Sequence, residues 1–201
     1  MLKYLVAHLL SGEASAFHKA LAQELTLRFH TLPLHERIPA HITVKPPFEA
    51  DEEGIAHVER ALRAFAQGER AAPLLYRGFG RFGFRTIYLD VQKSPEAVSL
   101  ARRALKMLNE NAYWLPRFPR EGNKLHASVA RFLAPRQSRR IWRFLRECTY
   151  PQFSSSLDNF AILKKDGRDW RVSAIIPLHA EERGFWYHEG YVHKEVQSVG
   201  R

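Results

Sequence analysis

The sequence predicts an α+β fold in which a β-α-β-α-β unit occurs twice. Short apolar runs typical of strands alternate with longer segments of helical periodicity. A histidine, an apolar, a hydroxyl and a β-branched residue follow one another at the same place in each half, as His41-Ile-Thr-Val and His126-Ala-Ser-Val. Equivalent strands also keep an almost constant separation, because Tyr88 follows Tyr4 by 84 positions and the second histidine follows the first by 85. A tandem duplication would produce this pattern.

The first unit spans approximately residues 1–84. Its elements are, in order, strand, helix, strand, helix and strand, expected at 3–10, 13–29, 41–45, from 52 onward and at 74–79. The histidine strand should end at Pro46 and Pro47, since proline has no N–H with which to continue a ladder. Asp51 is a favourable N-cap for the helix that follows.

The second unit, approximately residues 85–178, repeats this order. Its elements are a strand, a helix, a strand, a helix and two last strands, expected at 86–91, from 95 onward, at 125–132, 136–147, 159–164 and 171–177. Ser94 and Pro95 are typical of a helix start. Lys165 to Arg168 is typical of a turn between the last two strands. Residues 179–201 are expected to form a C-terminal tail.

Charge and composition narrow the class of protein. A formal charge of +10 and a pI near 10.0 favour polyanionic partners such as RNA, although many basic proteins bind no nucleic acid. No apolar run approaches the roughly 20 residues of a membrane span, and the first residues turn polar too soon for a signal peptide. One cysteine, Cys148, excludes an internal disulfide and fits a reducing compartment. We therefore expect a cytoplasmic protein.

The residues of the two tetrapeptides alternate between the faces of a strand. His41 and Thr43 share one face of their strand, and His126 and Ser128 share one face of theirs, while the residues between them face a core. Two such strands, brought together by pseudo-two-fold symmetry, would form one site with two imidazoles and two hydroxyls. Imidazoles exchange protons near neutral pH, and hydroxyls can donate to phosphate oxygens. The pattern therefore predicts acid–base chemistry on a phosphodiester.

Both tetrapeptides resemble the paired H-x-[ST]-x signatures of the two-histidine (2H) phosphoesterases. Within that superfamily the chain most resembles the bacterial 2′-5′ RNA ligase and RNA 2′,3′-cyclic phosphodiesterase branch, over most of its length up to about Leu178. The resemblance implies a bilobal α+β fold over residues 1–178, in which the repeats at approximately 1–84 and 85–178 form the lobes. Antiparallel sheets would surround a central groove that both motifs line. The resemblance also implies a metal-independent phosphodiesterase that needs no cofactor and acts on 2′,3′-cyclic phosphate or 2′-5′-linked RNA or nucleotides.

The family places both histidines and both hydroxyls at the phosphate, and leaves open which histidine is the acid. Two cations are further candidates for phosphate binding. Lys45 shares the strand face of His41 and Thr43, although a solvated strand end is an equal alternative. Arg131 stands where the family often has an arginine. Its parity is opposite to that of Ser128, so it reaches the site only if the strand bends there.

The segment before the second motif interleaves aromatic residues with arginines, a composition that suits base stacking and phosphate contact. The candidates for RNA contact in this segment are Tyr113, Trp114, Arg117, Phe118 and Arg120. A proline-rich loop packed on the surface is the alternative interpretation.

Two other functions compete with the enzyme. Arg77 to Phe84 partly matches the RNA-recognition octamer, in which aromatic residues on a strand stack on bases, so a non-catalytic RNA-binding module is the main alternative. A metal centre in the tail is the weaker one, because its candidate ligands have no recognised spacing. These candidates are His179, Glu181, Glu182, His188, Glu189 and His193. RNA or a nucleotide is the expected partner, with no membrane and no obligate protein partner.

Overall fold

The computed structural model describes residues 1–92, 94–117, 124–148 and 150–179. The strands are β1 (Leu2–Leu9), β2 (His41–Ala50), β3 (Ala72–Phe82), β4 (Thr86–Gln92), β5 (His126–Arg131), β6 (Gln152–Leu157), β7 (Asn159–Asp166) and β8 (Asp169–Pro177). The helices are α1 (Gly12–Phe29), α2 (Leu34–Arg37), α3 (Glu52–Gln67), α4 (Pro95–Asn111) and α5 (Pro135–Glu147). Every element expected from the sequence is present, so the α+β prediction is confirmed. The short α2 and the serine-rich β6 were not expected.

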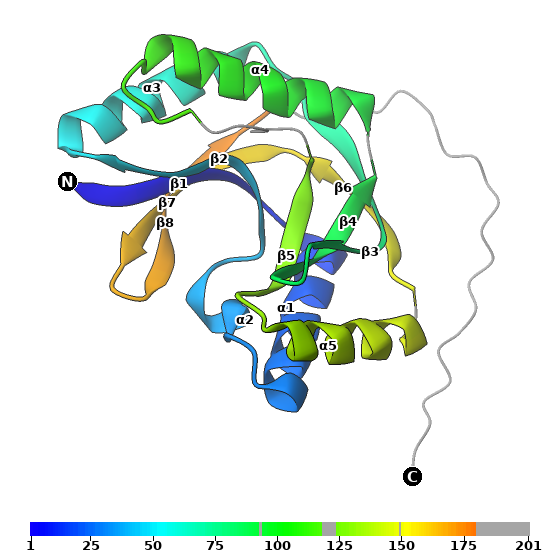
Figure 1. Cartoon of the computed structure of the whole chain (residues 1–201). Helices are drawn as coiled ribbons and strands as arrows, with labels where there is room; N and C mark the ends of the chain where they lie inside the picture. Colours follow the sequence, from blue (N-terminus) through cyan, green and yellow to red (C-terminus); the bar gives the residue numbers. More distant parts are fainter. Residues whose placement is uncertain (93, 118–123, 149, 180–201) are drawn as a thin grey trace, which may run out of the picture.

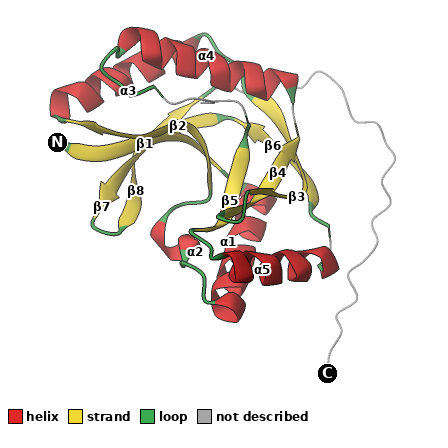
Figure 2. Cartoon of the chain, in the orientation of Figure 1, coloured by secondary structure: helices red, strands yellow, loops and turns green. Residues whose placement is uncertain are grey.

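The strands form two four-stranded antiparallel sheets, in the orders β2-β1-β7-β8 and β5-β4-β3-β6. Figure 1 shows α3 and α4 on one side of the molecule and α1 and α5 on the other. The strands lie between these two helical layers, as Figure 2 shows by colour. No described helix is long and apolar enough to cross a membrane.

The sheets do not coincide with the two units of the sequence, which corrects the expectation that residues 1–84 and 85–178 each form a lobe. β3 comes from the first unit but pairs with β4 and β6 in the second sheet. β7 and β8 come from the second unit but complete the first sheet, where β7 pairs with β1. Each sheet is therefore built from both halves of the chain. The order of elements along a sequence does not fix which strands pair.

β2 runs through the two prolines instead of ending at them. It is an edge strand, and its ladder with β1 slips between Tyr4 and Val6, opposite the segment that contains Pro46 and Pro47. Edge strands and bulges are the places where a sheet tolerates a residue that has no N–H to donate. The expected strand end was therefore wrong, and β2 continues to Ala50.

Both predicted helix caps are present. The Asp51 side chain accepts a hydrogen bond of 2.8 Å from the Gly54 N–H, and the Ser94 hydroxyl accepts one of 3.2 Å from the Ala97 N–H. These bonds satisfy backbone donors that have no partner within their own helix. They fix where α3 and α4 begin, directly after β2 and close after β4.

Most buried apolar side chains form one core that is continuous between the sheets and the helices. A second, smaller cluster lies on the other face of the first sheet and consists of Leu5, Ala7 and Leu163. Ala7 pairs with Thr43 in the ladder between β1 and β2, so this cluster shares the sheet face of the first motif. The face of β2 that carries the first motif is therefore next to a small apolar cluster that is separate from the main core.

Candidate active site

The two motifs show the alternation that the sequence predicts. Ile42, Val44, Ala127 and Val129 are buried in the main core, whereas the histidine and the hydroxyl residue of each motif are partly exposed. β2 and β5 are edge strands of different sheets, and they contact each other. The two sets of polar side chains therefore meet where the sheets meet.

Both histidines are held in the same way. The Nδ1 atom of His41 lies 2.8 Å from the carbonyl oxygen of Pro39, and the Nδ1 atom of His126 lies 3.0 Å from that of Lys124. A carbonyl oxygen can only accept, so Nδ1 carries the proton in each ring and Nε2 keeps a lone pair when the ring is neutral. Neither Nε2 atom has a hydrogen-bond partner in the described parts of the chain. Each ring therefore has one nitrogen fixed and the other available for proton transfer.

The pKa values of both histidines lie below the usual value of 6.5. Burial lowers the pKa of His41 to about 4, against the opposing effect of its bond to Pro39, and the charges of His18, Arg131 and His126 lower it further. Burial also lowers the pKa of His126, and the charges of Arg131 and Lys124 lower it further. The bond to the Lys124 carbonyl and the charge of Asp90 act in the opposite direction. Both imidazoles are therefore neutral at pH 7 in the free protein.

β5 contains a one-residue bulge directly after its hydroxyl residue. Two successive residues of β4 pair with Ser128 and Ala130, which leaves Val129 as an extra residue. The bulge moves the residues beyond it to the opposite face of the strand, so Arg131 shares the face of His126. This is the bend on which the prediction for the arginine depended. The charge of this arginine lowers the pKa of both site histidines, so it lies within electrostatic reach of both.

β2 has the same bulge at the equivalent place, and it corrects the prediction for Lys45. Two successive residues of β1 pair with Thr43 and Lys45, which leaves Val44 as the extra residue. Lys45 is consequently turned away from the Thr43 face and is completely buried. Its Nζ donates to Asn109 Oδ1 at 3.0 Å and to the Pro116 carbonyl at 2.6 Å. The lysine therefore anchors the loop after α4, and these contacts do not support a role as a phosphate ligand.

The loop after α4 contains some of the predicted RNA contacts. Tyr113 is 84% exposed, and Arg117 is also exposed. Trp114 instead packs edge-on against Phe48, with 6.3 Å between the ring centroids, and is 40% exposed. The tyrosine and the arginine stay candidates, while the tryptophan has a packing role. Two predicted contacts lie outside the described residues, namely Phe118 and Arg120.

Two aromatic rings at the site were not among the predicted site residues. The rings of Phe82 and Tyr88 lie 4.8 and 5.2 Å from the imidazole of His126, measured between centroids. The tyrosine ring lies over Gly80, where an added Cβ would be 2.2 Å from it, so glycine is needed there. Phe82 belongs to the segment that resembles an RNA-recognition octamer. The aromatic pattern was visible in the sequence, but its position beside the second histidine was not.

A third histidine supports the site from behind. His18 of α1 is buried, and its Nε2 lies 2.8 Å from the carbonyl oxygen of Ser128, the residue at which the β5 bulge begins. Bulges disrupt a ladder locally, and this bond satisfies a carbonyl at the disruption. A polar residue among the buried positions of α1 was the only signal of this role in the sequence. Burial also lowers the pKa of His18, so it donates as a neutral ring.

The candidate metal ligands of the tail fall mostly outside the described residues, which include only His179 of that set. Its Nε2 lies 3.0 Å from the carbonyl oxygen of Gln67 at the end of α3. Among the residues that the structure describes, no three histidine, cysteine or acidic side chains are grouped as a metal site would require. The others are Glu181, Glu182, His188, Glu189 and His193.

The structure has two antiparallel sheets, and the edge strands that meet each contribute a histidine and a hydroxyl. This arrangement resembles that of the 2H phosphoesterases. The model of the 2′-5′ RNA ligase superfamily matches residues 13–169, and the chain belongs to this superfamily. The predicted membership of this superfamily is confirmed.

Similar proteins agree with this assignment. A Bacillus cytotoxicus protein with a provisional phosphoesterase name is 28% identical over 152 residues, which cover 73% of this chain and 83% of the relative. TT0787 of Thermus thermophilus has the same fold, with a TM-score of 0.58, 20% identity, and coverage of 90% of this chain and 100% of the other. LigT of E. coli in its apo form gives a TM-score of 0.57 at 14% identity, covering 89% and 98%. At these identities the two solved structures show the fold alone.

Replacing His18 tests its supporting role. His18→Leu leaves the Ser128 carbonyl buried without a donor, which should lower the free energy of unfolding by about 1–3 kcal/mol. It should also lower kcat for phosphoester hydrolysis more than it raises KM, because the bulge determines the strand face on which Ser128 and Arg131 lie. His18→Gln keeps an N–H donor and should recover part of kcat. His57→Leu is the matched control, since the Nε2 of His57 bonds the Asn111 carbonyl, between two helices away from the site, at 2.8 Å. Equal losses of kcat in the leucine variants would contradict the role.

Proposed function

We propose that this chain is a metal-independent phosphodiesterase that acts on 2′,3′-cyclic phosphates or 2′-5′ linkages of RNA or nucleotides. The observation that carries the proposal is the matched pair of imidazoles. Each is fixed through Nδ1 by the carbonyl two residues before it, so that Nε2 can accept or donate a proton. A binding module would have no need for two proton-transfer groups held in the same tautomer.

In the hydrolytic direction His41 acts as the base and His126 as the acid. Nε2 of His41 takes a proton from water, whose oxygen attacks phosphorus. The bond from phosphorus to the ribose oxygen breaks, and Nε2–H of His126 supplies the proton that this oxygen needs. The assignment follows from the surroundings of the rings. Asp90 favours the protonated form of His126 against the opposing charges of Arg131 and Lys124, whereas no carboxylate of the described residues is among the groups that shift the pKa of His41.

The bound substrate allows one of the two imidazoles to become protonated. Burial keeps both rings neutral in the free protein, but a phosphodiester anion between them favours an imidazolium and raises its pKa. Thr43 and Ser128 can donate hydrogen bonds to the non-bridging oxygens, and Arg131 adds a positive charge near both rings. These donors stabilise the charge that grows on the oxygens in the transition state. The reverse reaction would use the same groups, so ligation of 2′-5′ ends is part of the proposal.

Nucleotide or RNA substrates are supported by two observations. The formal charge of +10 favours a polyanion, and LigT of E. coli, which shares the fold, has been solved with 3′-AMP and with ATP. We place the protein in the cytoplasm, because its single cysteine fits a reducing compartment. We propose no obligate protein partner.

A non-catalytic RNA-binding module is the second candidate, and the exposure of Phe82 favours it. This ring on β3 is 42% exposed and stands beside His126, where it could stack on a base. The two functions differ in one outcome: RNA affinity without turnover that survives loss of both histidines supports the module.

Incubation with 2′,3′-cyclic-phosphate oligonucleotides and 2′-5′-linked dinucleotides tests the enzyme directly, with the product phosphate located by mass and digestion. His41→Ala and His126→Ala should each lower kcat by about 10²–10⁴-fold, because each removes one proton-transfer group. Circular dichroism should show that both variants stay folded. His57→Ala is the control and should keep wild-type turnover. Turnover near the wild-type rate in either site variant rejects the two-histidine mechanism.

The pH profile follows from the direction of the two pKa shifts. For the free enzyme kcat/KM should rise through the pKa of His41, about 4, as the base loses its proton. It should fall through the pKa of His126, which burial holds below 6.5, as the acid loses its proton. The falling limb of kcat should lie at higher pH, because the bound phosphate raises the pKa of the acid. Turnover should persist in EDTA; activity that only rises with pH and needs zinc would indicate a metal mechanism instead.

Removing the hydroxyls separates binding from packing. Thr43→Val and Ser128→Ala leave the core-facing residues of both motifs unchanged, and each should lower kcat/KM on the order of 10²-fold with little change in melting temperature. Ser156→Ala on β6 is the control for loss of a partly buried hydroxyl on a strand. Variants that melt early in parallel with their loss of activity would show that the hydroxyls are structural.

A further inference from the structure

α5 carries an arginine-rich face that the catalytic site does not use. Arg136, Arg139, Arg140, Arg143 and Arg146 are all exposed. At 3.6 residues per turn they fall on one side of the helix, opposite the buried Ser138, Ile141 and Leu145. The 13-residue helix is about 20 Å long, so the charges are spread along a line rather than gathered at a point.

The arginines of this face have no carboxylate partner among the described residues. Four arginines elsewhere form ion pairs with acidic residues, namely Arg28, Arg63, Arg103 and Arg171. No side chain of the α5 face forms an ion pair with a carboxylate of the described residues. The acidic residue of the helix is Glu147, at its last position. Five unneutralised guanidinium groups in a row repel one another, and a polyanion relieves that repulsion.

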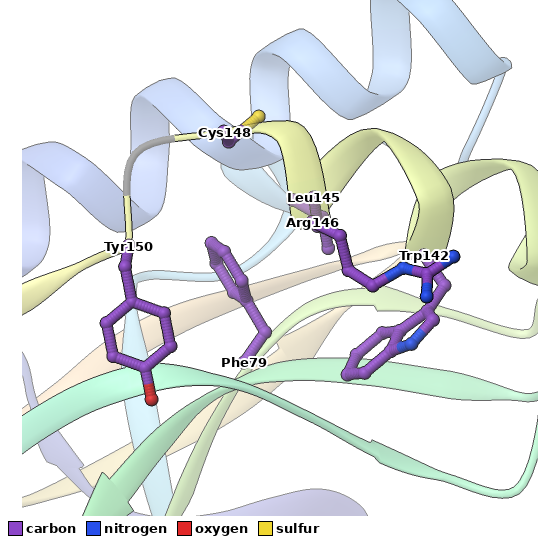
Figure 3. Close-up of a pocket in the computed structure, with 6 residues that line it drawn as sticks. All are labelled: Phe79, Trp142, Leu145, Arg146, Cys148 and Tyr150. Atoms are coloured by element: carbon purple, nitrogen blue, oxygen red, sulfur yellow. The ribbon is translucent and has the colours of Figure 1, made fainter.

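A pocket of about 240 Å³ opens beside the C-terminal half of this helix. Figure 3 shows side chains of β3 and α5 facing each other across it, with Tyr150 at the side. Three of its lining residues are aromatic, Phe79, Trp142 and Tyr150, and Arg146 links it to the arginine face. The volume is below the roughly 300–1,000 Å³ of pockets for drug-sized ligands, and so suits one ring system.

We propose that the α5 arginine face and this aromatic pocket form a docking surface for single-stranded RNA, separate from the histidine site. The arginines contact successive phosphates, and the pocket takes one unpaired base between its aromatic rings. This combination of a basic track with aromatic rings is the general design of single-strand binding, because every base has a π face. Duplex RNA keeps its bases paired, and an anionic membrane has none, so neither would use the pocket.

The α5 arginine face follows β5, the strand of the second motif, closely in the sequence. β5 ends at Arg131, whose charge reaches both site histidines, and α5 begins four residues later at Pro135. An RNA whose end lies at the histidines can therefore continue onto the helix. The inference rests on the proposed phosphodiesterase function and adds that long RNA is preferred to a small nucleotide.

Charge reversal on α5 tests the phosphate contacts. The variant Arg139→Glu/Arg143→Glu is compared with Arg60→Glu/Arg102→Glu, which changes two exposed arginines of α3 and α4 and gives the same net charge. Fluorescence anisotropy with a labelled single-stranded RNA of about 12 nucleotides and a free 3′ hydroxyl reports Kd over a range of salt. The α5 variant should bind at least about tenfold more weakly, and its salt slope should fall by about 1.4, at about 0.7 for each phosphate contact. The control should change Kd less than about threefold. Equal weakening in both variants overturns the proposal.

A pair of tyrosines tests the base pocket. Tyr150→Leu should weaken binding of the same RNA at least about fivefold, through loss of one stacked base. Tyr113→Leu makes the same change in the loop after α4 and should have a smaller effect. A larger effect at Tyr113 assigns the RNA to that loop and overturns the pocket. Binding of duplex RNA, or of vesicles with anionic lipid, as tightly as single-stranded RNA would likewise overturn the proposal.

Turnover of a dinucleotide 2′,3′-cyclic phosphate separates the two proposals. It should be unchanged in the α5 variant, whereas KM for a cyclic-phosphate oligonucleotide should rise. Absence of dinucleotide turnover in the wild-type protein rejects the enzyme, while the anisotropy data still decide whether α5 binds RNA. Loss of dinucleotide turnover in the α5 variant alone shows that the helix supports the catalytic site and rejects a separate surface.

Discussion

The site depends on a one-residue bulge that each histidine strand contains directly after its hydroxyl residue. Up to the bulge, regular alternation sends the histidine and the hydroxyl to one face and the apolar residues to the core. Beyond it, the faces exchange. In β5 this exchange turns Arg131 toward the histidines, and in β2 it turns Lys45 into the interior. The same backbone irregularity thus gives the two halves of the site different partners, so the site is symmetric at the imidazoles and asymmetric around them.

That asymmetry matters for the chemistry, because two identical imidazoles would have no reason to take different roles. The surroundings differ in one respect: a carboxylate, Asp90, is among the groups that act on His126, whereas no carboxylate of the described residues is among those that act on His41. In the proposed mechanism the fixed Nδ1 protons leave Nε2 of each ring for proton transfer. In that mechanism the substrate anion offsets the effect of burial on the pKa values, so that one ring can be protonated while the other stays neutral.

The sequence was sufficient for the features that depend on local periodicity. The strand alternation at His41 and His126, and the helix caps at Asp51 and Ser94, follow from rules that involve only neighbouring residues. Features that depend on partners distant in sequence could not be read in this way. The parity of Lys45 was wrong because a bulge is defined by a ladder with another strand, and the support by His18 depends on how α1 packs against β5.

The pairing of β7 with β1 couples the two ends of the chain. Tyr4 pairs with Lys164, and Ala7 with Ala161, so the first sheet is completed only by strands from the end of the described structure. Loop closure of this length costs entropy before the contacts form, and topologies dominated by such contacts fold slowly. An N-terminal fragment that ends at Phe84 would hold β1 and β2 without β7, and β3 without β4 and β6. The two halves of the chain are therefore not independent of each other, and during synthesis the first sheet cannot close until nearly the whole described chain has been made.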